Sequence, residues 1–159
     1  KRVELQLEAF KMMTDKKLVI IVGHVEGDVS GQYREKILRV IPENVSAAGV
    51  VSENELVELY AGCRGFVTTS MDEDFGLTAV EAMASGKAVV AVDEGGYRET
   101  VVHGKTGYLV EPNASAIIDA VIKISGKPNI YKKDCMARAK EFDIKIFMGK
   151  MESEIGKHK

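Results

Sequence analysis

The sequence predicts an α/β protein with a doubly wound, parallel β-sheet. Short apolar runs alternate with amphipathic stretches of helical period, the pattern of successive βαβ units. Two runs, Leu18–Val22 and Ala88–Val92, contain no polar residue, as is typical of strands buried on both faces of a parallel sheet. Right-handed crossovers between such strands place a ligand site at their carboxyl ends.

Each element follows from a local pattern: apolar residues three or four positions apart predict a helix, and short apolar runs predict a strand. Ser52-x-x-Glu55 is a capping box that opens a helix through Tyr60, and Gly86 ends another. The remaining expected helices are 3–13, 31–41, 75–85, 97–102, 114–125, 131–139 and 142–157, and the expected strands are 18–22, 45–48, 66–69, 88–92 and 107–110.

Composition indicates one soluble domain spanning residues 1–159, with 45% hydrophobic and 29% charged residues. No apolar run approaches the roughly 18 residues that a membrane-spanning helix needs, and the first residues lack the pattern of a secretory signal peptide. We therefore expect a cytoplasmic protein. Residues 44–113 hold 4 basic and 11 acidic side chains, which argues against a nucleic-acid partner.

The two cysteines, Cys63 and Cys135, form no CxxC motif and have no neighbouring histidine cluster, so we expect buried free thiols and no zinc site. Asp72-Glu73-Asp74 resembles a D-x-D site that holds a diphosphate through a divalent cation. Three consecutive acids are also typical of a solvated loop before a helix, where they suit the helix dipole. We expect no metal, and the acidic loop remains the alternative.

The most informative stretch, Ser70–Gly86, lies between two predicted strands at the carboxyl edge of the sheet. Glu73 and Glu81 are eight positions apart, or about 11–12 Å along a helix, which is too far for an acid–base pair on one atom. A carboxylate accepts two adjacent hydroxyl groups, and free N–H groups at a helix start bind phosphate. The pattern therefore suits a nucleotide sugar. The alternative is an amphipathic helix with acidic capping residues and a buried apolar face.

The same stretch resembles the E-x7-E region of retaining glycosyltransferases of the GT-B fold, in particular glycosyltransferase family 4. The matching residues are Glu73-Asp74-Phe75-Gly76-Leu77, Glu81-Ala82-Met83-Ala84, Gly86 and Val89-Val90, with further matches at Val19–Gly23, Gly49–Val51, Glu55-Leu56, Leu59-Tyr60, Gly95-Gly96-x-x-Glu99 and Gly104-x-Thr106-Gly107. The resemblance covers roughly residues 1–125. It implies a Rossmann-like C-terminal half of a GT-B fold, followed by C-terminal helices.

The resemblance also implies roles for single residues. Glu73 would bind a hydroxyl of the donor sugar beside the reacting carbon, as the catalytic residue, and Glu81 would accept hydrogen bonds from the ribose. The other implied donor-binding residues surround the diphosphate or the base: Lys1 as a phosphate clamp, Gly23, His24, Val50, and the backbone N–H groups of Phe75, Gly76 and Leu77.

The activity that the resemblance implies is transfer of a hexose from GDP-mannose or a UDP-sugar to a glycan or lipid-linked acceptor, with retention at the anomeric carbon. A front-face route, in which the leaving phosphate takes the acceptor proton, needs no cofactor, no metal and no dedicated base. The resemblance implies an enzyme of the cytoplasm. Peripheral association of the full enzyme with the inner face of the membrane is an open alternative.

The resembled enzymes have an acceptor-binding N-terminal domain and a central first strand, neither of which this sequence contains. We therefore expect the natural protein to continue before Lys1, and the present sheet to have a gap. Two departures affect loops: Ala88 stands where proline is usual, and Val25–Asp28 replaces a G-x-G-P turn.

Two other classes of function stay open. A non-catalytic nucleotide- or sugar-binding module would keep Glu81 and the helix start but would not need Glu73 or an acceptor domain. A flavodoxin-like regulatory domain would need a lone aspartate at one strand end and a lysine at a later one, and Lys87 is poorly placed for that.

Overall fold

The computed structural model describes residues 1–21 and 28–157. Its strands form two parallel sheets, one of β1 (Leu18–Ile21) and β2 (Val45–Ala48), the other of β3 (Phe66–Thr68), β4 (Val89–Val92) and β5 (Gly107–Val110), in the order β3-β4-β5. The helices are α1 (Val3–Met12), α2 (Asp28–Arg39), α3 (Glu53–Gly62), α4 (Leu77–Ala84), α5 (Tyr97–Thr100), α6 (Ala114–Gly126), α7 (Lys132–Lys140) and α8 (Ile144–Gly156), and a 3₁₀ turn covers Pro128–Tyr131. The predicted parallel α/β architecture is confirmed.

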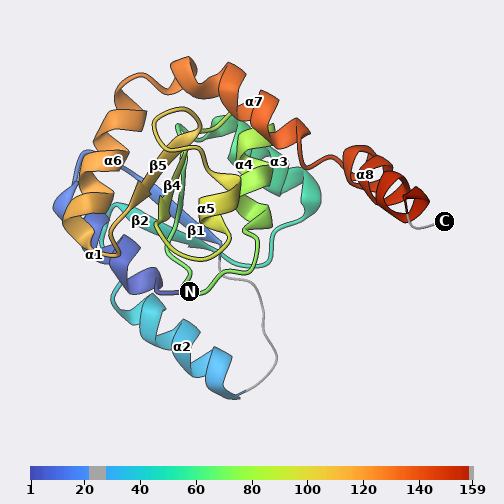
Figure 1. The fold of residues 1–159 in the computed structure, drawn as a ribbon. Helices are drawn as coiled ribbons and strands as arrows, with labels where there is room; N and C mark the ends of the chain where they lie inside the picture. The colour runs from blue at the N-terminus through green and yellow to red at the C-terminus, as the bar shows by residue number, and fades with distance from the viewer. Residues whose placement is uncertain (22–27, 158–159) are drawn as a thin grey trace.

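Strand β4 is the centre of the core. Its four residues are fully buried, as the all-apolar run predicts, and it pairs with β3 on one edge and β5 on the other. Helices α1 and α6 pack together on one side of the sheets, while α3 and α4 lie on the other (Figure 1). Helix α7 packs along α4. Helices on both sides of parallel strands are what a doubly wound fold requires.

The prediction that strand β1 is buried on both faces is wrong. Ile20 is buried, but Val19 and Ile21 are each 46% exposed. Successive side chains of a strand point to opposite faces, so one face of β1 is covered and the other is not. In the described chain, β1 pairs only with β2 and β3 pairs only with β4, which leaves one edge of each strand without a partner.

Helix α4 begins two residues later than predicted, because Gly76 occupies the N-cap with left-handed φ and ψ of 80° and 48°. It ends at Ala84, one residue earlier than predicted, and Gly86 is the stop that the sequence predicts. Gly86 has φ 74°, its N–H donates to the Met83 carbonyl, and the Lys87 N–H donates to the Ala82 carbonyl, which together form a Schellman motif. The capping box of Ser52 and Glu55 is also confirmed at the start of α3.

The C-terminal helix α8 lies apart from the body of the protein and has no buried residue (Figure 1). In the part of the chain that the structure describes, no helix is both long and apolar enough to cross a lipid bilayer.

The pairing of β4 with β5 depends on a residue without a side chain. A Cβ atom added to Gly107 would lie 1.8 Å from the Val89 carbonyl oxygen, which belongs to the backbone and cannot turn aside. We predict that Gly107→Ala lowers the free energy of unfolding by about 3 kcal/mol, the upper end of the 1–3 kcal/mol that overpacking of a core commonly costs, because the contact is with backbone. Urea denaturation followed by circular dichroism measures this loss.

Gly149→Ala is the matched control, because Gly149 lies in α8 with no atom within 4 Å of the added Cβ. It should leave stability unchanged or raise it, since alanine favours a helix by about 0.5–1 kcal/mol over glycine. Equal stability of the two variants would contradict the described strand pairing.

Candidate functional site

An ion pair joins the first residue of the chain to the acidic loop after β3. The Lys1 Nζ lies 2.7 Å from Glu73 Oε2, although the two residues are 72 positions apart. The hydrogen bond from Lys1 lowers the pKa of the Glu73 carboxyl, and the same bond raises the pKa of the Lys1 ammonium. The pair is open to solvent, with side-chain exposure of 69% for Lys1 and 24% for Glu73. Two residues predicted for one site are thus in direct contact.

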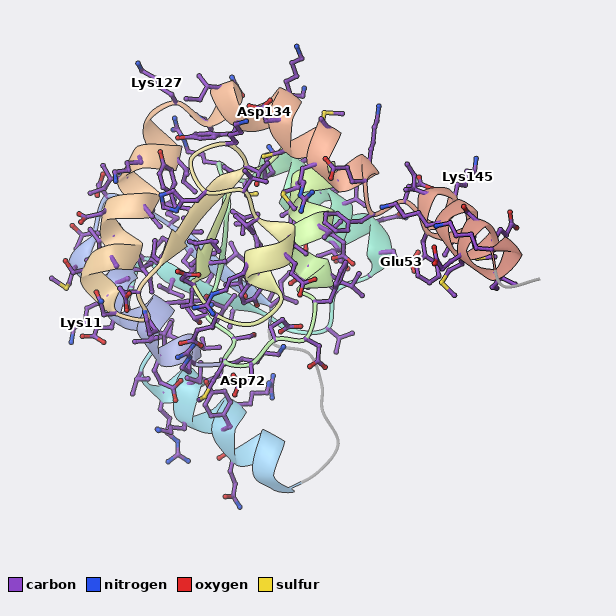
Figure 2. The ribbon with its side chains drawn as sticks, viewed as in Figure 1. Lys11, Glu53, Asp72, Lys127, Asp134 and Lys145 are labelled. Carbon is purple, nitrogen blue, oxygen red and sulfur yellow. The ribbon has the colours of Figure 1, made fainter. Side chains whose placement is uncertain are left out.

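The backbone at Glu73 is fixed by two glycines after β4. The Gly96 N–H donates to the Glu73 carbonyl oxygen at 2.7 Å. A Cβ atom would lie 2.5 Å from the Glu73 oxygen if added to Gly95, and 2.4 Å from the Asp74 oxygen if added to Gly96. The Gly95-Gly96 pair of the sequence motif therefore allows two loops to touch through their backbones. Asp72, in the same loop, has φ of +48°; Figure 2 labels it near the N-terminal end of the chain.

The start of α4 lies beside this loop and presents free backbone donors. Gly76 has no side chain to cap the helix, so the first N–H groups, including that of Leu77, are open to an acceptor. A Cβ atom at Gly76 would lie 2.8 Å from the ring of Tyr97. Tyr97 is itself fixed by a 2.6 Å hydrogen bond to the buried Thr68 hydroxyl. Phe75 packs edge to face on Phe142, with ring centroids 5.4 Å apart.

Glu81 accepts a hydrogen bond from a residue that the spacing of the motif does not predict. The Tyr60 hydroxyl donates to Glu81 Oε2 at 3.1 Å and lies 3.3 Å from the Thr78 carbonyl oxygen. Tyr60 is buried, as expected for a core residue, and this burial raises the pKa of its hydroxyl, as does the Glu81 charge. Glu81 is exposed, so its carboxylate is oriented by Tyr60 and still reachable from solvent.

Of the remaining residues predicted for the site, Val50 alone belongs to the described part of the chain. Val50 follows β2, at the carboxyl end of that strand, and its side chain is 74% exposed. The predictions for Gly23 and His24 lie outside the described residues. Both cysteines are free, as predicted, and Cys135 is fully buried. The predicted burial of Cys63 is wrong: this residue caps the end of α3 and is only half-buried.

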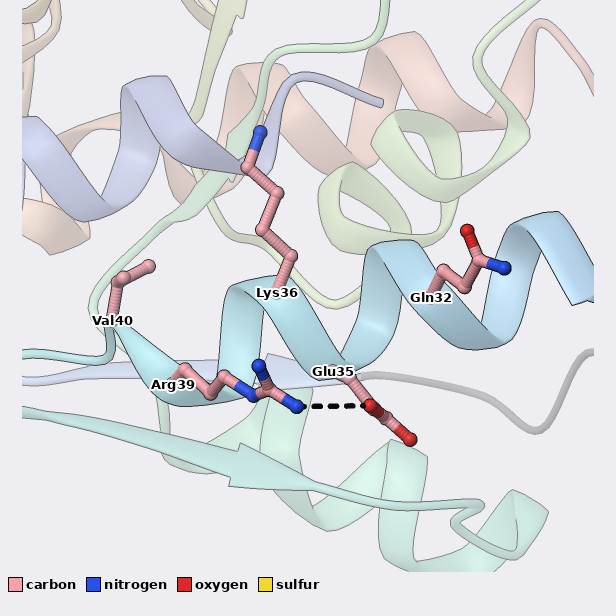
Figure 3. Close-up of a pocket in the computed structure, with 5 residues that line it drawn as sticks. All are labelled: Gln32, Glu35, Lys36, Arg39 and Val40. Carbon is pink, nitrogen blue, oxygen red and sulfur yellow. Dashed lines mark hydrogen bonds and ion pairs between the residues drawn. The ribbon is translucent and has the colours of Figure 1, made fainter.

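A hollow away from this site is lined by none of the residues predicted for it. A shallow hollow on α2 is lined by Gln32, Glu35, Lys36, Arg39 and Val40, with an ion pair of 3.4 Å between Arg39 and Glu35 (Figure 3). Within residues 1–21 and 28–157, no three His, Cys, Asp or Glu side chains are grouped so that they could hold a metal ion.

Three residues at the site were missed by sequence analysis: Arg2, Thr69 and Glu94. The Arg2 guanidinium pairs with Glu94 at 2.6 Å, and its Nε donates to the Thr69 carbonyl oxygen at 3.0 Å. The position of Glu94 directly before Gly95-Gly96 was the only available signal, since nothing in the local sequence of Arg2 or Thr69 predicts these contacts.

Comparison with known proteins identifies the family. The model of the family described as glycosyl transferases group 1 matches residues 1–142. The chain belongs to this family. Among solved structures, Anabaena HepE in complex with UDP aligns with a TM-score of 0.82 and 25% identity over 99% of this chain and 45% of HepE. Sucrose-phosphate synthase from Thermosynechococcus elongatus aligns with a TM-score of 0.81 and 25% identity, over 99% of this chain and 43% of the synthase.

These neighbours have the GT-B, Rossmann-like architecture that the resemblance implied, which confirms the fold of this group 1 glycosyltransferase chain. Among curated relatives, the alpha-1,3/1,6-mannosyltransferase ALG2 of Dictyostelium discoideum is 41% identical over 83 residues, which make up 52% of this chain and 20% of ALG2. The chain thus spans less than half the length of these relatives.

The Lys1–Glu73 pair should make stability depend weakly on pH. Because folding lowers the pKa of Glu73, the stabilisation is present above the ordinary carboxyl pKa and is lost as the pH falls through the lower, folded value. We predict that Glu73→Gln costs no more than about 1 kcal/mol at pH 7, since exposed pairs contribute little. The difference from the parent should disappear progressively below about pH 4.

Urea denaturation at pH 7 and pH 3 measures this difference, with Glu8→Gln, at an exposed position of α1, as the control. A Glu73→Gln penalty that is larger at pH 3 than at pH 7 would show that the stabilisation has another source.

Proposed function

We propose that this chain is the nucleotide-sugar-binding, C-terminal domain of a retaining hexosyltransferase of the glycosyltransferase family 4 type. The observation that supports this most directly is the contact between Lys1 and Glu73 beside the open start of α4. A cation, an acceptor of hydroxyl groups and free N–H donors within one site match the charge and polarity of a sugar diphosphate.

Each part of the site has a chemical role in this proposal. The Lys1 ammonium and the N–H groups at the start of α4 bind the diphosphate and stabilise the charge that grows on it as the bond from the anomeric carbon to the phosphate oxygen breaks. Glu73, released from Lys1 by the phosphate, accepts a hydroxyl of the sugar. The acceptor hydroxyl attacks from the same face, and its proton passes to the leaving phosphate, so configuration is retained without a metal.

Glu81 binds the ribose in this scheme. Tyr60 occupies one carboxylate oxygen and holds the side chain against α3, while the exposed side of the carboxylate accepts the ribose hydroxyls. Glu73 and Glu81 thereby bind the two ends of one elongated ligand. Val50, Gly23 and His24 complete the surroundings of the base and the diphosphate.

The comparisons support a donor of the GDP-mannose or UDP-sugar class. One relative is a mannosyltransferase, and one structural neighbour binds UDP. We propose transfer to a glycan or lipid-linked acceptor that an N-terminal domain binds, in the cytoplasm or at the inner face of the membrane. We also propose that a strand from before Lys1 lies between β1 and β3, which is supported by the unpaired edges of these two strands and the exposed Val19 and Ile21.

Calorimetric titration of UDP, GDP and ADP into the chain, with EDTA present, tests the proposed ligand class. We predict saturable binding of one nucleotide without metal, and a loss of about 1.5–3 kcal/mol of binding free energy in Glu81→Ala, the usual range for hydrogen bonds to a charged group. Glu58→Ala, which removes an exposed carboxylate from the neighbouring α3, should bind as the parent does.

The other outcomes separate the alternatives. Binding that requires Mg²⁺ or Mn²⁺ would favour the acidic loop Asp72-Glu73-Asp74 as a metal site. Undiminished affinity in Glu81→Ala would contradict the ribose role. No binding in either the chain or the full natural protein would overturn the proposed ligand class.

Transfer activity tests the role of Glu73 and separates an enzyme from a binding module. In the full natural protein, Glu73→Ala should lower kcat by about 100-fold or more while changing the KM for the donor far less, because its contact forms beside the reacting carbon. Release of UDP from UDP-glucose, or of GDP from GDP-mannose, measures both constants.

Asp74→Ala is the control, because it removes the adjacent exposed carboxylate without touching the contact with Lys1. A variant at Glu73 that loses donor affinity but keeps kcat would contradict its proposed position. A parent protein that binds nucleotide but releases none from its sugars would favour the non-catalytic module.

A further inference from the structure

Arg2 and Glu94 form an ion pair that is forked and partly buried, unlike an ordinary ion pair on a protein surface. Its two terminal nitrogens face the two oxygens of Glu94, at 3.3 and 2.6 Å, in a forked arrangement. Its third donor, Nε, bonds the Thr69 carbonyl oxygen at 3.0 Å. Both charged side chains are about three-quarters buried, with exposures of 24% and 28%. Forked, partly desolvated pairs are the strong and geometrically specific ones.

The backbone of Arg2 adopts a conformation that this residue type avoids. Its φ and ψ of 50° and 44° lie in the left-handed region, which costs about 1–2 kcal/mol for residues other than glycine. Such a conformation persists only where surrounding contacts fix it, and it is concentrated at functional sites. Here the hydroxyl of the buried Thr69 donates toward the carbonyl oxygens of Lys1 and Arg2, at 3.0 and 2.9 Å, while Glu94 holds the side chain.

The contacts form a closed ring around the site. Glu94 precedes Gly95-Gly96, and the Gly96 N–H bonds the Glu73 carbonyl oxygen. Glu73 pairs with Lys1, which is bonded in sequence to Arg2, and Arg2 pairs with Glu94. A displacement of Glu94 is therefore transmitted to Glu73 through the glycines, and a displacement of Arg2 is transmitted to Lys1 through one peptide bond.

We infer that Arg2 and Glu94 are a positioning pair that holds the Lys1 ammonium and the Glu73 carboxylate in register for sugar transfer. This inference rests on the proposed function. Arg2 does not serve as a phosphate ligand in this arrangement, since three of its donors and its charge are already matched within the protein. The Lys1 ammonium, by contrast, is exposed, and among the described contacts its one partner is the Glu73 carboxylate.

The test compares Arg2→Gln, Glu94→Gln and the double variant in the full natural protein, by release of UDP from UDP-glucose and of GDP from GDP-mannose. Each single variant should lower kcat by about 10-fold to 100-fold, since a displacement of about 1 Å at a catalytic group has effects of this size. The KM for the donor should change less than about threefold. The double variant should lose no more than the worse single variant, because either change breaks the same pair.

Asp93→Asn is the matched control. Asp93 is the residue before Glu94 and also pairs with an arginine, with Arg98 Nε at 2.8 Å, but it has no contact with Arg2 or Lys1 in the described structure. Its kcat should equal that of the parent. Its melting temperature should lie within a few degrees of that of Glu94→Gln, so that a lower kcat in Glu94→Gln reports displaced site residues and not unfolding.

The remaining outcomes are decisive. Equal kcat in Glu94→Gln and Asp93→Asn, or losses that simply add in the double variant, would overturn the positioning role while leaving the proposed function intact. A raised KM in Arg2→Gln together with a lowered KM in Glu94→Gln would show instead that Arg2 binds the phosphate itself. A parent that releases nucleotide from neither sugar would overturn the proposed function and this inference together.

Discussion

The buried polar groups of Thr69 tie the start of the chain to the end of β3, and the geometry of the site depends on this junction. Thr69 is only 1% exposed, so its hydroxyl and carbonyl must find partners within the protein. Gln6 donates to the hydroxyl at 3.0 Å, the hydroxyl donates toward the carbonyls of Lys1 and Arg2, and Arg2 donates to the Thr69 carbonyl. The hydrogen bonds that the buried polar groups of Thr69 require thereby fix the first turn of α1 and, with it, Lys1.

Close approach of backbones is the second constraint on the site. At Gly95 and Gly96 the loop after β4 touches the backbone of Glu73 and Asp74, and at Gly76 the start of α4 touches the ring of Tyr97. Any side chain at these positions would separate elements that the site requires together. The main chain of Glu73 is thereby held by the Gly95-Gly96 loop, and its carboxylate is paired with Lys1. The Glu73 side chain remains partly exposed.

The two halves of the fold differ in how completely they are enclosed. The sheet β3-β4-β5 has a fully buried central strand, and it carries Glu73, the loop of Gly95-Gly96 and α4. The sheet β1-β2 has one exposed face, with Val19 and Ile21 open to solvent. The enclosed half therefore offers the more rigid support for Glu73 and the start of α4, and groups placed on such a support keep their geometry more closely.

The sequence by itself determined what depends on local period and local chemistry. The apolar run of β4, the capping box at Ser52, the stop at Gly86 and the position of the E-x7-E stretch after a strand were all predictable, because each depends on residues within one or two turns. The start of α4 was predicted two residues early, since only the folded loop shows that Gly76 takes a left-handed conformation.

Tertiary structure alone decided the contacts between distant residues. Lys1 with Glu73, Arg2 with Glu94 and Tyr60 with Glu81 join positions 72, 92 and 21 residues apart, and no periodic pattern encodes such pairings. Burial of both faces of β1 was wrongly expected for a related reason: an apolar run reports which side chains favour burial, but the neighbouring strands and helices decide whether they are covered.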